Sequence, residues 1–373
     1  MNSFKQLGVS DDYSKALEEM GILHPTEIQM RVIPELLTSN TDLVGHAQTG
    51  TGKTAAYGLP LLQRINTKVS QIQGLILCPT RELGQQVDKQ LFKFTKYSEK
   101  VFTEAVYGGA PIEKQISALK RPTHVLVATP GRLVDLLNRK AVDLSNVNVV
   151  VLDEADEMLS MGFKKDLETI LSFLHEAQNK WLFSATMPVG IKQIVNNHLS
   201  AGAKRVVVNP KSKVNRNIDH QYIACEDADK LNVLLEVLRI QKESRGVIFC
   251  RTKTATTTLT KQLQAKNIKA DCIQGDMLQK ERDKAMRAFK NENVQILVAT
   301  DLAARGIDVP GLAYVIHYQL PDKEEYYTHR SGRTARAGQS GVSLALVNSK
   351  ELRSMRYFEK ALNIAFHQIR LKQ

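Results

Sequence analysis

The sequence predicts an α/β protein with two open, mostly parallel sheets, each with helices on both faces. Two observations favour this fold class. Short apolar runs alternate with longer amphipathic stretches, which is the pattern of parallel strands with crossover helices. At 373 residues the chain is also too long for one ordinary domain of about 150 residues, so we expect two domains. The hydrophobic content of 43% is ample for two cores.

Ten strand-like runs are divided equally between the two halves of the chain. In the first half they are residues 43–44, 75–78, 124–128, 147–152 and 181–183. In the second half they are residues 247–250, 270–273, 294–299, 314–317 and 342–347. Most polar residues of interest come directly after one of these runs. Because open α/β sheets bind ligands at the carboxyl ends of their strands, this placement predicts a ligand-binding edge on each sheet.

A polar, basic segment divides the two halves. Residues 209–216 contain a proline and lack an apolar period, so we expect a flexible linker there. The expected domains are therefore residues 1–208 and 217–373. The last strand-like run is followed only by a short amphipathic segment, 352–362, which predicts a closing helix and no separate tail domain.

Composition indicates a soluble protein with a polyanionic partner. The net charge of +12 and the isoelectric point near 9.4 favour nucleic acid, although a generic basic surface would give the same balance. No signal peptide opens the chain, and no apolar run reaches the roughly 18 residues that a membrane span needs. We therefore expect a cytoplasmic protein, by default a monomer. The cysteines lack metal-ligand spacing and are expected to be reduced core thiols: Cys78, Cys225, Cys250 and Cys272.

Residues 47–54 (AQTGTGKT) form a variant of the phosphate-binding loop, placed directly after a strand-like run. Gly50 and Gly52, with Thr51 between them, allow backbone N–H groups to approach phosphate oxygens. The strict pattern has glycine where Ala47 stands. A chance match in an unrelated loop is the alternative interpretation.

Two further groups complete the expected phosphate chemistry. Lys53 begins a predicted helix and is expected to reach the β- and γ-phosphates, with the Thr54 hydroxyl on Mg²⁺. Asp153 and Glu154 emerge side by side from a buried strand, and adjacent carboxylates repel unless a cation holds one of them. We expect Asp153 to bind Mg²⁺ and Glu154 to act as the base for the attacking water. The alternative is that Asp153 caps the following helix.

An arginine-rich string, residues 329–336 (HRSGRTAR), lies so far along the chain that we expect it on the second domain. Phosphoryl transfer needs positive charge on the γ-phosphate, and arginine supplies it bidentately. Arg333 and Arg336 are three apart, so on a helix they would share one face. A solvated basic face is the alternative. The residues expected to carry catalysis are then Lys53, Glu154, Arg333 and Arg336.

These strings, in this order, resemble the DEAD-box RNA helicase family of superfamily 2, whose namesake string stands at residues 153–156. The resemblance covers essentially the whole chain and implies a minimal helicase core of two tandem RecA-like domains. It also implies ATP and Mg²⁺ as cofactors and RNA as the partner. One departure is Thr51, where the family often has serine.

The resemblance assigns further nucleotide contacts. Residues 25–29 (PTEIQ) resemble the adenine-reading Q motif, in which Gln29 would pair with the base edge and the upstream Phe4 would stack on the base. A buried N-terminal aromatic is the alternative for Phe4. Asp308 matches the family's ribose contact.

The resemblance also implies contacts with the RNA backbone, made without reading sequence. In the first domain these are Pro79, Arg81, Gly108, Gly109, Thr129 and Arg132. In the second domain they are Arg251, Gln279, Arg282 and Thr300. The residues implied to couple hydrolysis to RNA binding are Asp156, Ser184, Thr186 and His329.

The sequence therefore predicts an RNA-stimulated ATPase whose domains close over ATP and RNA and separate short duplexes locally. The RNA is expected to be single-stranded or a short duplex, chosen through 2′-OH contacts and A-form shape and not through base sequence. Two alternatives stay open. One is an ATP-gated RNA clamp that remodels RNA–protein complexes, and the other is a DNA-directed motor.

Overall fold

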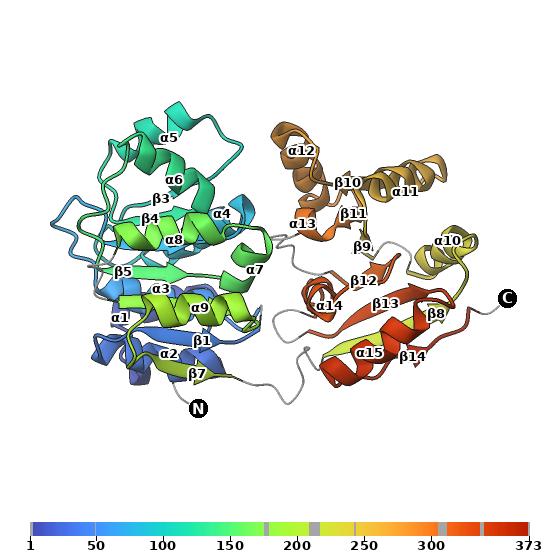
Figure 1. The fold of residues 1–373 in the computed structure, drawn as a ribbon, viewed down its shortest axis with the longest axis horizontal. Helices are drawn as coiled ribbons and strands as arrows, with labels where there is room; N and C mark the ends of the chain where they lie inside the picture. The colour runs from blue at the N-terminus through green and yellow to red at the C-terminus, as the bar shows by residue number, and fades with distance from the viewer. Residues whose placement is uncertain are drawn as a thin grey trace. The chain divides into compact units, whose positions relative to one another are not determined.

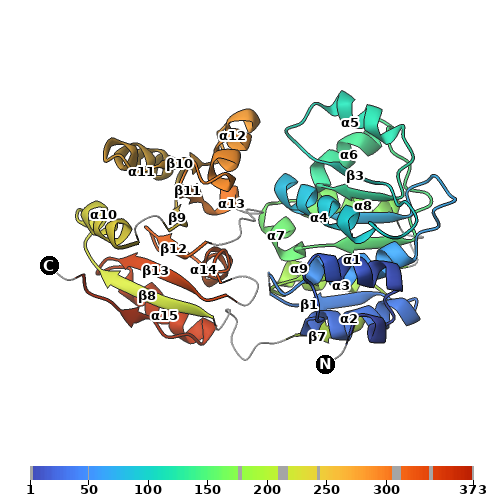
Figure 2. The same cartoon turned by 180° about the vertical axis from the view of Figure 1, so that it is seen from behind.

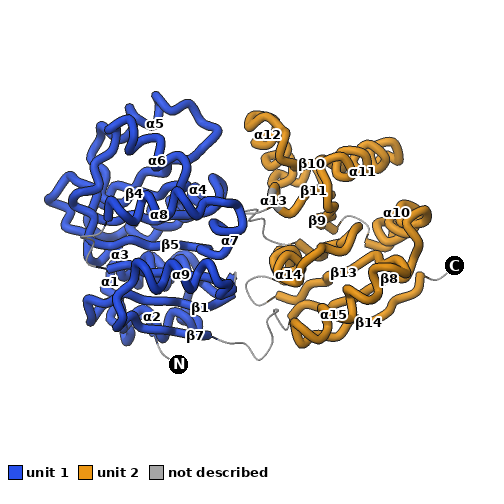
Figure 3. Tube along the Cα trace, in the orientation of Figure 1, with its two compact units in different colours: residues 1–209 blue, residues 210–373 orange. Residues whose placement is uncertain are grey.

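The computed structural model describes residues 3–48, 50–174, 179–208, 217–241, 244–304, 312–335 and 339–371. The chain divides into two compact units, Met1–Asn209 (unit 1) and Pro210–Gln373 (unit 2), as Figure 3 shows. The expected linker, 209–216, lies outside the described residues. Each unit holds one seven-stranded sheet in which every pair of neighbouring strands is parallel.

The sheet of unit 1 has the strand order β3-β4-β2-β5-β6-β1-β7. Its strands are β1 (Leu43–His46), β2 (Gly74–Leu77), β3 (Thr103–Val106), β4 (Val125–Ala128), β5 (Val149–Leu152), β6 (Asn179–Ser184) and β7 (Lys204–Val207). Every residue of the central strands β2, β4 and β5 is buried. Parallel strands are covered on both faces, which explains why these segments read as continuous apolar runs.

Helices cover both faces of this sheet (Figures 1 and 2). One apolar core lies under η1 (Lys5–Leu7), α1 (Asp11–Glu19), α2 (Glu27–Thr38), α3 (Lys53–Gln63) and α4 (Arg81–Phe94). A second core lies under α5 (Ile112–Leu119), α6 (Pro130–Asn138), α7 (Ala155–Ser160), α8 (Lys164–Phe173) and α9 (Val189–His198).

The sheet of unit 2 has the order β10-β11-β9-β12-β13-β8-β14. Its strands are β8 (Ile218–Ala224), β9 (Gly246–Cys250), β10 (Ala270–Ile273), β11 (Ile296–Thr300), β12 (Tyr314–His317), β13 (Gly341–Val347) and β14 (His367–Gln368). Its helices are α10 (Lys230–Gln241), α11 (Lys253–Ala265), α12 (Gln279–Lys290), α13 (Asp301–Ala304), α14 (Glu324–Ser331) and α15 (Leu352–Leu362). The cores again lie on both sides of the sheet.

The α/β fold class is confirmed, and all ten expected strands are present with ends within two residues of the prediction. Four strands were missed: β3, β7, β8 and β14. Three of them are the edge strands β3, β7 and β14, whose residues are partly or fully exposed except for the buried Val106 at the end of β3. Strand β8 mixes buried with exposed positions. A strand that is not buried on both faces does not need an apolar run, so it gives a weak signal in the sequence.

The cysteines are all free, but only two of them lie in a core. Cys78 and Cys250 are buried, as expected, whereas Cys225 and Cys272 are only partly buried and pack against the margin of a core. The prediction of free thiols is confirmed for all four, and the prediction of a fully buried position was wrong for the second pair. Within the described ranges, every helix is either too short or too polar to cross a bilayer.

Candidate functional site

The loop between β1 and α3 is held in shape by the first turn of α2. The Thr26 hydroxyl donates to the carbonyl of Thr51 at 2.8 Å, and Gln29 Nε2 donates to the carbonyl of Gly52 at 3.0 Å. Gln29 Oε1 also accepts from the backbone N–H of Thr26 at 2.9 Å. The buried Gln29 amide, predicted from the resemblance to read adenine, is therefore also a support of the phosphate loop itself.

Two glycines of this loop have a left-handed backbone, with φ of +80° at Gly50 and +87° at Gly52. A Cβ atom placed on Gly52 would overlap the amide nitrogen of Gln29, whereas one placed on Gly50 would meet nothing within 4 Å. The backbone conformation alone requires glycine at position 50. At position 52 both the conformation and the close approach of Gln29 require it.

Lys53 is the first residue of α3, and only 6% of it is exposed. Its ammonium donates to the carbonyl of Ala47 at 3.2 Å, which folds the side chain back across the loop. Thr54 follows it on α3. Phe4 lies in the apolar core of unit 1 with 4% of it exposed, so stacking on a base would require Phe4 to leave that core.

The carboxylate of Asp153, directly after β5, is buried and doubly hydrogen-bonded. Its Oδ2 accepts from the Tyr57 hydroxyl at 2.8 Å, and its Oδ1 accepts from the N–H of Glu154 at 3.0 Å. Burial raises the pKa of Asp153, and the nearby charge of Lys53 opposes this rise. A bound cation would lower this pKa again, and carboxylate and hydroxyl oxygens are the ligands that Mg²⁺ prefers. Asp153 with Thr54 is therefore a donor set that fits Mg²⁺.

Tyr57 was missed in the sequence analysis. It lies four residues after Lys53 on α3, so the two side chains share a helix face, and this spacing was the available signal. The alternative role of Asp153 as a helix cap does not hold. The N-cap residue of α7 is Glu154, and its side chain makes no capping bond.

The backbone of Glu154 is left-handed, with φ of +49° and ψ of +50°. A residue with a Cβ in this region pays about 1–2 kcal/mol relative to the right-handed region. The turn ends β5 and begins α7 within one residue. It leaves Asp153 buried and Glu154 half-buried, so the two adjacent carboxylates have different environments.

The loop after β6 is tied to both α7 and β1. Asp156 Oδ2 accepts from the backbone N–H and the hydroxyl of Thr186, at 2.8 and 2.7 Å. The Ser184 hydroxyl donates to the carbonyl of Thr186, and His46 Nε2 contacts the carbonyl of Ala185 at 2.9 Å. Asp156 Oδ1 is buried and accepts no hydrogen bond from the described part of the chain, so this oxygen can still receive a donor.

A polar cluster links the three segments of unit 1 that are implied in RNA binding. Arg132 donates to Gln115 Oε1 at 2.7 Å and to the carbonyl of Ala110 at 3.0 Å. Gln115 in turn donates to the carbonyl of Tyr107, and the guanidinium of Arg81 lies 4.7 Å from the centre of the Tyr107 ring. These contacts fix the segment that carries Gly108 and Gly109, both of which are exposed. The remaining predicted contacts in this unit are the buried Pro79 and Thr129.

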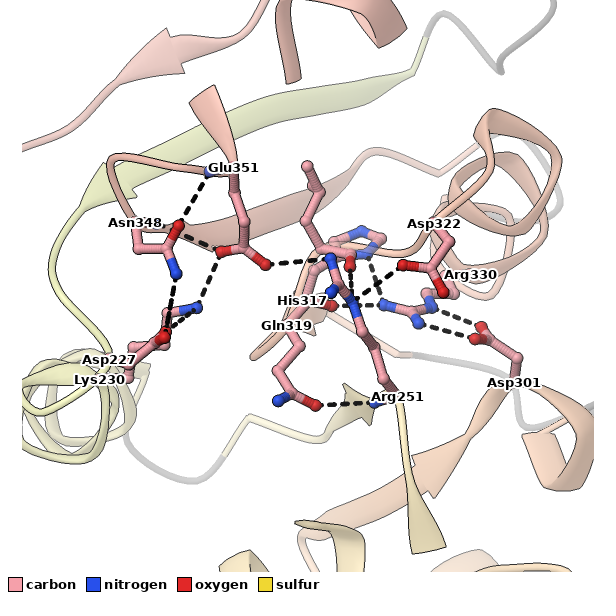
Figure 4. Close-up of polar contacts among 11 residues, drawn as sticks. Asp227, Lys230, Arg251, Asp301, His317, Gln319, Asp322, Arg330, Asn348 and Glu351 are labelled. Atoms are coloured by element: carbon pink, nitrogen blue, oxygen red, sulfur yellow. Dashed lines mark hydrogen bonds and ion pairs between the residues drawn. The ribbon is translucent and has the colours of Figure 1, made fainter. Parts of the chain in front are cut away.

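In unit 2, Arg251 is held by several acceptors (Figure 4). It donates to the carbonyl of Leu320 at 2.5 Å and to Glu351 at 3.2 Å, and it lies 3.5 Å from Asp322. Glu351 also pairs with the buried Lys230 at 2.9 Å. Arg251 thus connects the end of β9 to the segments that carry Leu320 and Glu351. Only part of its guanidinium remains available to a ligand.

The other implied RNA contacts of unit 2 are two residues in the first turn of α12 and one at the end of β11. Gln279 donates to Asp283 at 2.9 Å, and Arg282 donates to the carbonyl of Ala303 at 2.9 Å. Thr300 ends β11 and is buried, with 7% of it exposed.

Arg330 is fully buried and paired with a carboxylate that the sequence analysis did not single out. Its guanidinium makes two bonds to Asp301, at 2.5 and 2.7 Å, and a third to the carbonyl of Gln319 at 2.8 Å (Figure 4). It also lies over the Phe249 ring at 5.1 Å. A buried guanidinium needs a geometry of this kind to offset its desolvation. The pair joins α13 to α14 and so fixes the helix that precedes Arg333.

Arg333 lies beyond the end of α14, so the helical spacing considered for it and Arg336 does not apply. It is buried, with 8% of it exposed, and its Nε donates to the carbonyl of His329 at 3.1 Å. Arg336 and Asp308 lie outside the described residues.

Comparisons with known proteins decide the family. Residues 26–194 match the DEAD/DEAH box helicase family, and residues 229–338 match the helicase conserved C-terminal domain. The DEAD-box ATP-dependent RNA helicase CshA of Geobacillus kaustophilus is 42% identical over 360 residues, which are 96% of this chain and 76% of that protein. CshA of Bacillus subtilis is 41% identical over 358 residues, 96% of this chain and 72% of that protein. The chain belongs to the DEAD-box helicase family.

Solved structures of helicases share the fold. Saccharomyces cerevisiae Dbp5 bound to RNA and ADP BeF3 is 28% identical with a TM-score of 0.90, covering 99% of this chain and 96% of that chain. Mss116p bound to ssRNA and AMP-PNP is 28% identical with a TM-score of 0.89, covering 100% of this chain and 80% of that one. A DEAD box protein of Methanococcus jannaschii is 38% identical, with a TM-score of 0.58 and 99% of both chains covered. The expectation of two RecA-like domains in a helicase enzyme is confirmed.

The two loop glycines make a matched pair for mutagenesis. Gly50→Ala should cost about 1–2 kcal/mol of the unfolding free energy of unit 1, from backbone strain alone. Gly52→Ala should cost about 1 kcal/mol more, because its Cβ displaces Gln29 from the carbonyl of residue 52. Urea denaturation of the full chain measures both. Equal losses for the two variants would show that the contact with Gln29 does not constrain the loop.

Buried histidines predict an acid-sensitive unit 2. Burial lowers the pKa of His220, which bonds to the Tyr327 hydroxyl at 2.6 Å, from 6.5 to about 4. Between these two values the unfolded chain binds a proton that the folded unit does not. The unfolding free energy should therefore fall on acidification from pH 6.5 to 4, by on the order of 3 kcal/mol from this residue.

His220→Gln retains an acceptor for Tyr327 and should flatten this fall, measured as the urea midpoint of unit 2 against pH. Above about pH 8, where the imidazole is neutral in both states, the variant and the natural protein should differ by a constant. An unchanged slope between pH 6.5 and 4 would rule out His220 as its source.

Proposed function

We propose that this helicase hydrolyses ATP when RNA is bound and uses the cycle to separate short RNA duplexes locally. The observation that carries the proposal is the juxtaposition in unit 1. The phosphate loop at the end of β1 lies on the same sheet edge as Asp153 and Glu154 at the end of β5. Relatives at 41–42% identity that are named ATP-dependent RNA helicases, and neighbours solved with RNA and nucleotide, support the choice of substrates.

The first unit provides the groups for hydrolysis. Lys53 exchanges its bond with the carbonyl of Ala47 for the phosphates of ATP, while the loop N–H groups hold their oxygens. Asp153 and Thr54 would hold Mg²⁺, which when bound neutralises charge on the phosphates. Glu154, less buried than Asp153, orients and deprotonates the attacking water.

The second unit supplies charge to the same reaction. Arg333 and Arg336 contact the γ-phosphate, and Asp308 contacts the ribose, by the family pattern. Arg333 follows the end of α14, and its Nε donates to the carbonyl of His329 in that helix. The position of its guanidinium therefore depends on the last turn of α14. The buried pair of Arg330 with Asp301 secures that helix.

RNA binds along both units in the proposed cycle. ATP and RNA each contact both units, so each favours the closed state and raises the affinity for the other. Closure bends one strand into a backbone shape that a duplex cannot share, which expels the partner strand. Asp156 and the 184–186 loop are joined by two hydrogen bonds and couple ATP hydrolysis at the nucleotide site to the RNA-binding site.

Glu154→Gln tests the base. The amide retains the shape of the side chain but cannot accept the proton, so turnover should fall by about 10²–10⁴-fold while ATP affinity is retained. Steady-state hydrolysis and equilibrium binding of a fluorescent ATP analogue measure the two quantities. Glu168→Gln, at an exposed position on α8, is the control and should hydrolyse normally. Near-normal hydrolysis by Glu154→Gln would remove Glu154 as the base.

The test of the whole function is the ATPase rate against added single-stranded RNA, with DNA of matching sequence, at two salt concentrations. We expect strong stimulation by RNA alone that weakens with salt. Equal stimulation by DNA would favour the DNA-directed motor, and a rate indifferent to RNA would reject the proposed coupling. RNA stimulation without strand separation, with long residence on RNA, would favour the clamp.

A further inference from the structure

The positive charge of the chain is concentrated in one unit. Residues 1–209 hold 23 Lys and Arg against 21 Asp and Glu, a net charge of +2. Residues 210–373 hold 28 against 18, a net charge of +10 out of the total of +12. A uniform basic surface would be shared between units of similar size. The asymmetry indicates that unit 2 has a larger polyanion-binding surface than unit 1.

Helix α12 carries three exposed cations on one side. Lys280, Lys284 and Arg287 are spaced by four and three residues, which places them in one stripe along the helix. We call these residues the α12 stripe. Across the described segments of the chain, none of the three has an ion-pair partner.

The stripe is unfavourable for the helix that carries it. The like-charged neighbours Lys280 and Lys284, and Lys284 and Arg287, lie at spacings where such pairs destabilise a helix. Lys280 also lies in the first turn, where the helix dipole disfavours a cation. Only Arg287, in the last turn, lies where the dipole favours positive charge. Folding alone therefore does not account for the stripe.

In the part of the chain that the structure describes, the acidic residues of α12 form no ion pair with the stripe. Glu281 accepts from the backbone N–H of Leu278 at 3.1 Å, and Asp283 accepts from Gln279 at 2.9 Å. Both carboxylates are therefore engaged at the first turn of the helix. The phosphates of a bound polyanion could supply ion-pair partners for the three cations.

We propose that the α12 stripe binds phosphates of the RNA backbone beyond the stretch held by Gln279 and Arg282 at the amino end of the helix. The inference rests on the proposed RNA-dependent function. The stripe covers about 10 Å of helix axis, a length over which one nucleic acid strand presents about three phosphates. Lys280 follows Gln279 at the amino end of the helix, on a different side of α12 from Arg282, whose side chain turns to the carbonyl of Ala303. RNA held at this end that turns along the outer side of the helix would meet the stripe.

The test compares two double variants of the full chain. Lys284→Gln with Arg287→Gln removes two charges from the stripe and retains good helix formers. Arg353→Gln with Lys360→Gln removes two exposed charges from α15 and is the control. Helix α15 packs near the β8–β14 end of the sheet, and α12 packs near β10 at the opposite end (Figures 1 and 2).

Two quantities are measured with an unstructured oligouridylate. The slope of log affinity against log salt should become shallower by about 1.4 in the stripe variant, because each lost phosphate contact on a single strand contributes about 0.7. The RNA concentration that gives half-maximal ATPase should rise by roughly 3- to 10-fold, with the maximal rate retained. The control variant should match the natural protein in both.

An unchanged slope in the stripe variant, or an equal change in the control, would overturn the proposal. The first result would show that the stripe does not touch RNA, and the second that unit 2 acts only through its total charge. Failure of the underlying function would look different. In that case the natural protein itself would show no stimulation by RNA.

Discussion

The parallel direction of every strand pair is the constraint on which both units depend. It brings the carboxyl ends of the strands to one edge of each sheet, whatever their separation in the chain. The backbone N–H of Ala47 donates to the carbonyl of Ser184 at 3.1 Å, and that of Asp153 donates to the carbonyl of Leu77 at 2.9 Å. Those hydrogen bonds between neighbouring strand ends bring the loop after β1, the adjacent carboxylates of Asp153 and Glu154, and the 184–186 loop to the same edge of the sheet. A change in strand order would separate them even if every motif were kept.

The same edge places charged side chains where they are shielded from water, which costs desolvation free energy. The two units compensate this desolvation differently. In unit 1 the buried Asp153 is stabilised by a phenol and a backbone N–H, and burial still raises its pKa. No cationic side chain forms an ion pair with Asp153 in the described residues, and a bound cation would lower its pKa. In unit 2 the buried Arg330 has a full carboxylate partner in Asp301, so its charge is already compensated. The first arrangement suits a site that gains and loses a charged ligand, and the second suits a fixed support.

Much of this could be predicted from the sequence, because buried parallel strands leave apolar runs and phosphate loops leave short contiguous strings. What escaped prediction depends on contacts between distant segments. Nothing local marks Asp301 as the partner of Arg330, which follows 29 positions later. The bond of Gln29 to the loop carbonyl of Gly52 likewise appears only after α2 packs beside α3. The edge strand β7 was missed because its exposed side chains need no apolar pattern.

The backbone of Glu154 runs against the local preference of its residue type. Glycine would relieve the strain of its left-handed backbone, about 1–2 kcal/mol, and would also remove the carboxylate. A right-handed residue at this position would not make the same abrupt passage from β5 to α7, and Asp153 would lose the N–H that now donates to its Oδ1. The left-handed turn at Glu154 therefore has three consequences: it strains the backbone, it directs the N–H toward Asp153, and it gives Asp153 and Glu154 different environments. The fold can retain it because buried strands on both sides of β5 fix the segment before the turn.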